Sequence, residues 1–259
     1  MIAALNAFAP RISWALEKGD IAQAASELFG VSAILWLALA AIVGCAVERE
    51  GPSPSTADRT VASGIILLAL LPAPLIASTL LIGLGLYAWR TAAGDDRLRR
   101  IAAVALALTL TLLWGPLLLR LFPELLTLDA AMTAKALGME SDGNLFWTVD
   151  RAGRYLIAPG CSSLANVSLA TIFMVTVTAW LRLPFRWGLV GWGLLASLAT
   201  VAVNVTRLSL FATRADEFEY WHSGGGSVLF GWFNFIALGS VVVFAAAREQ
   251  TRVARHAEV

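Results

Sequence analysis

Three residues able to do covalent chemistry stand at the edges of apolar segments. Cys161 follows Pro-Gly where a charged loop gives way to a long apolar run. Arg207 lies inside the next apolar run, three residues after Asn204, and His222 lies in the loop that follows. A histidine beside a thiol can accept its proton and later return it to a leaving group. We therefore predict that Cys161, Arg207 and His222 are catalytic residues.

The position of Arg207 inside an apolar run is unusual. An arginine at the centre of a membrane helix costs about 2.5 to 3.5 kcal/mol, so such residues normally face the bundle interior or an aqueous cavity. Asn204 stands three residues earlier and therefore lies on the same helix face. The alternative is an arginine that snorkels to the membrane interface and has no chemical role.

Cys161 is predicted to start a helix, because Pro-Gly precedes it and the apolar run follows. Free N–H groups at a helix N-terminus and a nearby guanidinium both favour a thiolate, so we expect a lowered thiol pKa. The alternatives are a structural cysteine and a loop histidine without a role. Asn204, Ser162 next to the thiol, and Gly224 in a glycine triplet that lets the backbone approach closely are predicted to contact the substrate.

The composition places these residues in a membrane protein. Hydrophobic residues make up 58% of the 259-residue chain and charged residues 14%, whereas a soluble domain carries about 25% charged residues. The expected class is a polytopic protein surrounded by lipid bilayer. No basic patch with interleaved aromatic residues indicates nucleic acid. The two histidines and two cysteines do not match a common zinc-binding spacing, so we expect no metal and no cofactor.

Apolar runs predict the membrane-spanning helices, since about 20 residues cross a hydrocarbon core. The predicted spans are 28–47, 101–119, 162–181, 187–211 and 228–247. The uncharged stretch 60–89 is interrupted by the sequence LPAP, so we expect two short passes there rather than one kinked helix. The expected fold class is all-α, a polytopic transmembrane helix bundle of about six to eight spans.

Charge and hydropathy divide the chain into four parts. We expect an N-terminal interfacial segment at 1–27, N-terminal spans at 28–120, a core with three catalytic spans at 121–247, and a cytoplasmic tail at 248–259. The core includes a structured outer loop at 122–160. Helical spacing in its first half predicts an interfacial helix. The β-formers and aromatics of its second half predict a short hairpin or cap, or else an aromatic belt at the interface.

Arginines in the short loops set the expected orientation. They cluster at 90–100, at 182–186 and after the last span. Counting spans places these clusters on one side, and the positive-inside rule makes that side the cytoplasm. Cys161, Arg207 and His222 then all meet the opposite, outer face of the membrane.

At these residues the sequence resembles the exosortase/archaeosortase family of membrane cysteine transpeptidases. The resemblance rests on CSSL at Cys161, NVTR at Asn204–Arg207 and His222, and it covers roughly residues 100–247. Ser163 stands where the family usually has glycine. The resemblance implies a bacterial inner-membrane enzyme, associated with exopolysaccharide, whose active site faces the periplasm or exterior.

The resemblance also implies a substrate and a reaction. The substrates would be membrane-anchored proteins with a C-terminal sorting signal: a short motif, a transmembrane helix and a basic tail. Cys161 would form a thioester with the substrate, His222 would act as base and then acid, and Arg207 would stabilise the oxyanion, with Asn204 holding Arg207 or the substrate. The acyl group would pass to an acceptor.

The rival hypothesis is a non-enzymatic polytopic membrane protein, such as a transporter or an assembly partner. Arg207 would then line a substrate path, or pair with an acidic residue such as Asp216 or Glu217.

Overall fold

The computed structural model describes most of the chain and shows it to be predominantly α-helical, as predicted. The described residues are 1–18, 20–26, 28–47, 53, 55–71, 73–184 and 186–257. Residues 19, 27, 258 and 259 of the predicted interfacial segment and tail lie outside this set. Contacts divide the chain into two compact units, Met1–Trp114 with Ile172–Pro184, and Gly115–Thr171 with Phe185–Val259.

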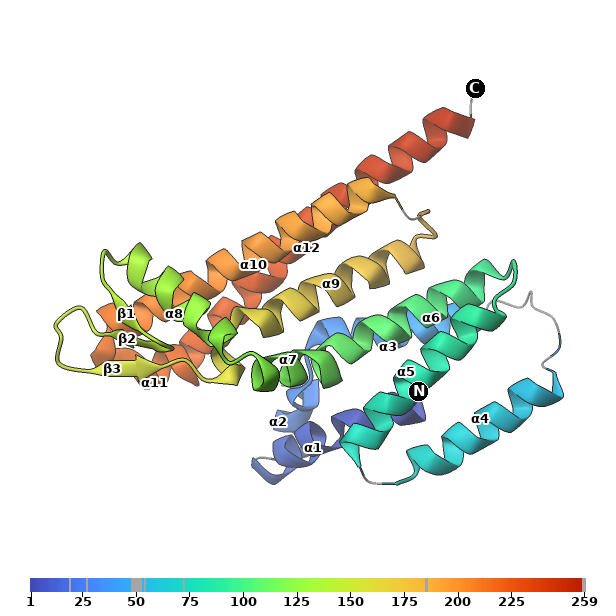
Figure 1. Ribbon diagram of the computed structural model, residues 1–259, viewed down its shortest axis with the longest axis horizontal. Helices are drawn as coiled ribbons and strands as arrows, with labels where there is room; N and C mark the ends of the chain where they lie inside the picture. The colour runs from blue at the N-terminus through green and yellow to red at the C-terminus, as the bar shows by residue number, and fades with distance from the viewer. Residues whose placement is uncertain are drawn as a thin grey trace. The chain divides into compact units, whose positions relative to one another are not determined.

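The first unit consists of helices (Figure 1). They are α1 Ile2–Lys18, α2 Ile21–Ser26, the 3₁₀ turn Leu28–Gly30, α3 Ala33–Val47, α4 Thr56–Ala69, α5 Pro74–Thr91 and α6 Asp96–Thr109. The predicted break at the sequence LPAP is confirmed as the division between α4 and α5. Pro74 takes the first position of α5, where its missing N–H costs no helical hydrogen bond.

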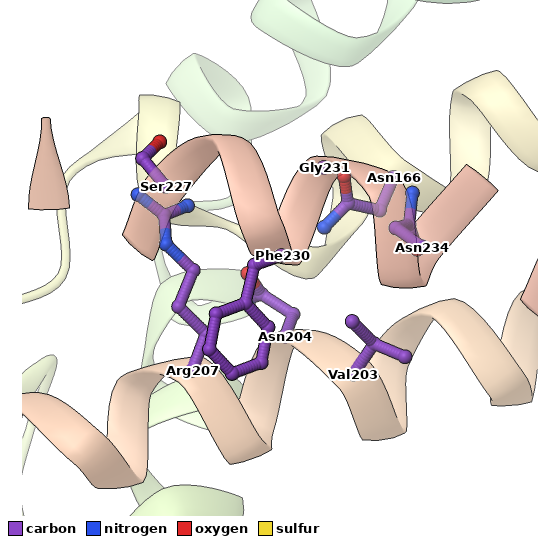
Figure 2. A pocket seen from close by; sticks show the side chains of 8 residues that line it. All are labelled: Asn166, Val203, Asn204, Arg207, Ser227, Phe230, Gly231 and Asn234. Atoms are coloured by element: carbon purple, nitrogen blue, oxygen red, sulfur yellow. The ribbon is translucent and has the colours of Figure 1, made fainter. Parts of the chain in front are cut away.

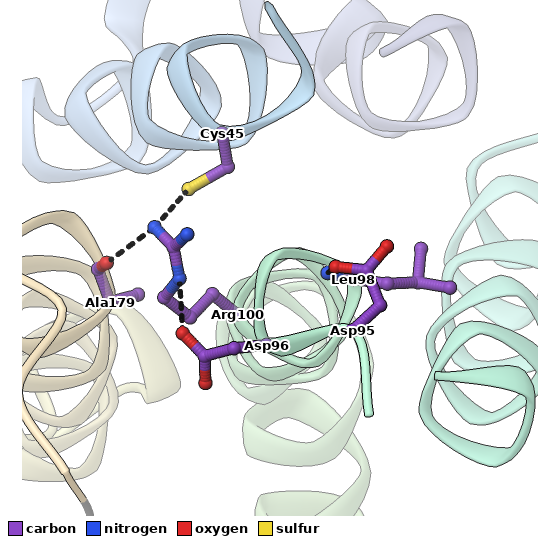
Figure 3. Close-up of polar contacts among 6 residues, drawn as sticks. All are labelled: Cys45, Asp95, Asp96, Leu98, Arg100 and Ala179. Atoms are coloured by element: carbon purple, nitrogen blue, oxygen red, sulfur yellow. Dashed lines mark hydrogen bonds and ion pairs between the residues drawn. The ribbon is translucent and has the colours of Figure 1, made fainter. Parts of the chain in front are cut away.

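Arg100 links three segments of the first unit (Figure 3). Its guanidinium donates to Asp96 at 3.1 Å, to the Cys45 sulfur at 3.4 Å and to the Ala179 carbonyl at 3.3 Å. Cys45 is buried in α3, and both cysteines of the chain are free thiols. A buried guanidinium requires such acceptors, because its charge and its N–H groups are costly to remove from water.

Gly85 allows α5 and α6 to approach closely. A Cβ at Gly85 would lie 2.7 Å from Leu106 Cγ, whereas a Cβ at Gly83 meets nothing within 4 Å. We expect Gly85→Ala to lower the free energy of unfolding by about 1–3 kcal/mol relative to Gly83→Ala, through overpacking. Both substitutions gain the same helix propensity, so the difference isolates packing. Denaturant unfolding in detergent measures it, and equal midpoints for the two variants would contradict it.

A π-helical turn, Leu110–Trp114, joins α6 to α7, Gly115–Leu121. Pro116 follows this turn and has no N–H to donate to a preceding carbonyl, which disturbs regular α-helical bonding. The division between the two units falls at the end of this turn.

The second unit carries all the predicted site residues. Its remaining elements are α8 Glu124–Ala136, β1 Ser141–Asp142, β2 Leu145–Trp147, β3 Arg154–Leu156, the 3₁₀ turn Pro159–Cys161, α9 Ser163–Trp180 (shared between the units at Ile172), α10 Trp187–Thr213, the 3₁₀ turn Ala215–Glu217, α11 Phe218–His222 and α12 Gly225–Ala257. α10 and α12 run side by side, and α8 contacts the strands (Figure 1). The predicted helix and hairpin in 122–160 are both confirmed.

The three short strands form an antiparallel sheet in the order β1-β2-β3, with Phe146 opposite Tyr155. Phe146 is buried with Leu126 and Ala130 of α8 and with Leu208 of α10. This apolar cluster fixes α8 against α10, and so it positions the two helices whose polar side chains meet at Cys161.

Four helices of the described chain are long and apolar enough to cross a membrane. They are Asp96–Leu121, Ser163–Trp180, Trp187–Thr213 and Gly225–Arg252, while the apolar helix Ala33–Val47 is shorter. Large apolar side chains such as Leu198 and Phe244 are exposed on the long helices. This is the surface expected of lipid-facing helices, and it supports the membrane class.

Candidate active site

Cys161 ends a 3₁₀ turn rather than starting a helix. Its N–H donates to the Ala158 carbonyl at 2.9 Å, Ser162 is extended, and α9 begins at Ser163. The Ser162 hydroxyl accepts a hydrogen bond from the Leu164 N–H at 3.1 Å and so caps the first turn of α9. The prediction that Cys161 starts the helix is wrong by two residues, because this cap lies after the cysteine.

Asp129 of α8 anchors the Cys161 turn. One of its carboxylate oxygens accepts hydrogen bonds from the Ser162 hydroxyl and the Ser163 N–H, both at 3.0 Å. The residue is only 2% exposed. Sequence reasoning missed Asp129, although an acid between Leu126 and Thr133 on the apolar face of an amphipathic helix is a usable signal, since a buried carboxylate requires partners.

Asn204 holds the same turn from α10. Its amide nitrogen donates to the Cys161 carbonyl at 2.9 Å and to the Ser163 hydroxyl at 3.0 Å. Two of the three predicted substrate contacts, Ser162 and Asn204, therefore use these groups within the protein. The Ser163 hydroxyl has a partner that a glycine would lack. The turn is fixed by side chains from α8 and α10 together.

His222 ends the short helix α11, and so it does not lie in a loop as predicted. Its Nε2 lies 3.9 Å from the Cys161 sulfur. The imidazole stacks on Phe218 with centroids 4.9 Å apart, and Phe218 stacks on Tyr155 at 4.8 Å. This aromatic stack orients the ring toward the thiol, and catalytic contacts without substrate are often longer than in the reacting complex.

Gly224 serves the turn between α11 and α12. Its N–H donates to the Glu219 carbonyl at 2.9 Å, and a Cβ there would lie 3.0 Å from Tyr220 Cα. The close backbone approach predicted at Gly224 is thus to the chain itself, and it brings α11 back toward α12.

Arg207 binds the end of α11 that carries His222. Its Nε donates to the Trp221 carbonyl at 3.3 Å, and a terminal nitrogen donates to the His222 carbonyl at 2.8 Å. Among the described residues no carboxylate pairs with this guanidinium: Glu217 instead pairs with Arg214 and accepts from the Trp221 indole. Arg207 therefore couples α10 to α11 and leaves its charge without an anionic partner.

The electrostatic surroundings of Cys161 differ from the prediction. Burial of the thiol raises its pKa, while Arg207 and the hydrogen bond to Ala158 act in the opposite direction and the Asp129 carboxylate adds to the rise. The predicted lowering of this pKa is therefore wrong in direction. The physical reason is that the thiol is partly buried and lies before the helix rather than in its first turn.

A raised thiol pKa predicts the pH dependence of Cys161 alkylation. The thiolate is the reactive form, so the iodoacetamide rate should rise about tenfold per pH unit from pH 7 to 9 without levelling off. Mass spectrometry of the detergent-solubilised protein measures the rate at Cys161 separately from that at Cys45. A plateau already reached at pH 7 would contradict this expectation, because it would require a lowered pKa.

A polar pocket of about 220 Å³ adjoins the site (Figure 2). Its lining comes from α9, α10 and α12: Asn166, Val203, Asn204, Arg207, Ser227, Phe230, Gly231 and Asn234. The side-chain oxygen of Asn234 is buried without a partner among the described residues. The pocket shares Asn204 and Arg207 with the Cys161 site, but Cys161 and His222 do not line it.

The described part of the chain holds no cluster of three or more metal-ligating side chains. No family model, curated protein or solved structure matches the chain. Function must therefore be argued from the geometry around Cys161.

Proposed function

We propose that the chain is a membrane-embedded cysteine protease or transpeptidase of the exosortase/archaeosortase type. The observation that carries the proposal is the 3.9 Å approach of the Cys161 sulfur to His222 Nε2, with Arg207 bound to the His222 carbonyl. Residues 61 positions apart supply a thiol and a base in reach of each other. Such a pair is the minimum required for thiol-based acyl transfer.

The reaction begins when His222 accepts the Cys161 proton as the sulfur attacks the scissile peptide carbonyl. Burial raises the pKa of the Cys161 thiol, so attack requires a base, and His222 is placed to supply it. A free N–H of Arg207 stabilises the oxyanion. The C–N bond then breaks, His222 protonates the leaving amine, and an acyl thioester remains on Cys161.

The thioester is resolved by an amine acceptor or by water. His222 takes a proton from the incoming nucleophile and returns it to the Cys161 sulfur as the thioester breaks. The products are the transferred or hydrolysed acyl chain and the free thiol, so the enzyme is regenerated without a cofactor.

The substrate class we propose is an exported protein anchored by a C-terminal apolar helix with a basic tail. Cys161 immediately precedes a membrane-length helix, and Arg207 and His222 lie near the ends of others. A substrate helix in the bilayer would present its first residues at that level. With six to eight spans in the bacterial inner membrane, the arginine-rich loops would face the cytoplasm and the site the periplasm or exterior.

The test is to recover the protein from its native membranes and search Cys161 by mass spectrometry for an acyl adduct. The proposal expects a polypeptide adduct that neutral hydroxylamine removes, since hydroxylamine cleaves thioesters. A matched sample treated with Tris at the same pH should keep the adduct. Absence of any adduct on Cys161 of the wild-type protein would reject the proposal.

The polar pocket favours a second candidate, a transporter in which Arg207 lines a substrate path. A half-buried arginine beside amide groups in a membrane-spanning region is typical of such a path. The two functions differ in what they require: a path depends on Arg207 and Asn234 but tolerates Cys161→Ala. Transport would be favoured if a growth defect of cells lacking the protein is complemented by Cys161→Ala but not by Asn234→Leu.

A further inference from the structure

The Asp129 carboxylate is unusual among the buried groups of the second unit. One oxygen accepts both hydrogen bonds from the Cys161 turn, while the other is buried and has no partner among the described residues. Within the described part of the chain no cation forms an ion pair with it. A buried carboxylate with no cation and a spare oxygen is costly unless its charge is used.

Its charge lies at the N-terminus of α9. Ser163 is the first residue of that helix, and its N–H points at the Asp129 oxygen from 3.0 Å. The positive end of the helix dipole favours an anion there. Asp129 occupies this position, so the Cys161 thiolate cannot use it.

Charged and titratable groups reach Cys161 from three helices. Asp129 approaches from α8, Arg207 from α10 and His222 from α11. The negative charge of Asp129 opposes the thiolate and the positive charge of Arg207 favours it. The carboxylate and the guanidinium therefore act on the same sulfur in opposite directions.

We propose that Asp129 is a positioning residue of the reaction, which fixes the Cys161 turn to α8 and, by placing its own charge at the α9 N-terminus, adds to the burial that holds the proton on the thiol until His222 takes it. The proposal rests on Cys161 being the nucleophile of the proposed function. A resting thiol resists oxidation and unproductive alkylation, and it becomes nucleophilic only as His222 accepts its proton during attack.

The substitution Asp129→Asn removes the negative charge of residue 129 but keeps an oxygen that can accept hydrogen bonds. An asparagine oxygen can accept the same two hydrogen bonds, so the turn is kept while the negative charge is lost. We expect iodoacetamide to alkylate Cys161 about three- to tenfold faster at pH 7.5, with the whole pH profile moved to lower pH. A Cys45→Ser background leaves Cys161 as the sole thiol and keeps an acceptor for Arg100.

Two controls make the result specific. Asp142→Asn removes an exposed acid on β1 and should leave the profile unchanged. Asp129→Glu keeps the charge and should also keep the wild-type position of the profile. An unchanged rate and profile in Asp129→Asn would overturn the proposal, and so would slower alkylation, because removal of a charge that opposes the thiolate predicts faster alkylation.

A folding failure of Asp129→Asn is also informative when Asp129→Ser and Asp129→Glu are compared with it. If only Asp129→Glu folds, a charge is required at the α9 N-terminus and the proposal is supported. If none of the three variants folds, the proposal is overturned. The assay needs no substrate. Absence of an acyl adduct in native membranes would therefore reject the proposed function and leave this measurement standing.

Discussion

Replacement of Cys161 by alanine is expected to abolish acyl transfer, with a loss of at least about 10³-fold. No other thiol can substitute, because Cys45 is buried in the first unit beside Arg100. The measurement is the acyl adduct in native membranes, together with accumulation of the uncleaved form of the polypeptide that the wild-type protein carries. Persistence of cleaved polypeptide in Cys161→Ala cells would refute the nucleophile assignment.

Two further variants sharpen this prediction. Cys161→Ser keeps the shape of the turn but replaces the thiol with a much weaker nucleophile, so any adduct it forms should be an ester that resists neutral hydroxylamine. Cys45→Ser should form the thioester at the wild-type level. This pair distinguishes the chemistry of Cys161 from a general requirement for cysteine.

The helices of the candidate site could be predicted from the sequence because their signals are local. The apolar runs predicted at 162–181 and 187–211 are seen as Ser163–Trp180 and Trp187–Thr213. The length of an apolar run depends on neighbouring residues alone. Pro74 likewise acts locally, because its ring disfavours the helical conformation in the residue before it.

The anchoring of the site could not be predicted, because it depends on contacts between distant residues. Asp129 and Ser162 are 33 positions apart, and Asn204 and Cys161 are 43 apart. The predicted lowering of the Cys161 pKa was wrong for the same reason. The α9 N-terminus can favour a thiolate only if no other anion occupies it, and Asp129 of α8 lies there. Local sequence identified the candidate residues Cys161, Arg207 and His222 but not Asp129, which lies against the Cys161 turn.

The same contacts explain why two predicted substrate contacts serve the scaffold. Ser162 and Asn204 are polar residues next to the thiol, which is the pattern expected of substrate recognition as well as of a braced turn. Their hydrogen bonds to Asp129 and to the Cys161 carbonyl form the brace, and their contact with a substrate stays a prediction. The polar groups left open to a ligand lie instead in the pocket beyond Asn204, at Asn166 and Asn234.

Replacement of Arg207 by glutamine is expected to slow acyl-enzyme formation by about 10²- to 10³-fold, the usual cost of losing an oxyanion donor. It also removes the donors that bind the Trp221 and His222 carbonyls, so α11 loses these two hydrogen bonds to α10. Arg207→Lys keeps the charge but cannot reproduce the planar two-carbonyl contact, so its rate should fall between those of Arg207→Gln and the wild type.

The pH profile of Cys161 alkylation distinguishes the effect of the Arg207 charge from the effect of its hydrogen bonds to α11. Loss of the Arg207 charge removes the main influence that favours the thiolate, so the profile of Arg207→Gln should move to higher pH, opposite to that of Asp129→Asn. Arg207→Lys should stay near the wild type. Arg214→Gln, which removes an exposed arginine just after α10, is the matched control and should change neither profile nor rate. Arg207→Gln protein with wild-type acylation would show that neither the charge nor the link to α11 contributes to the reaction.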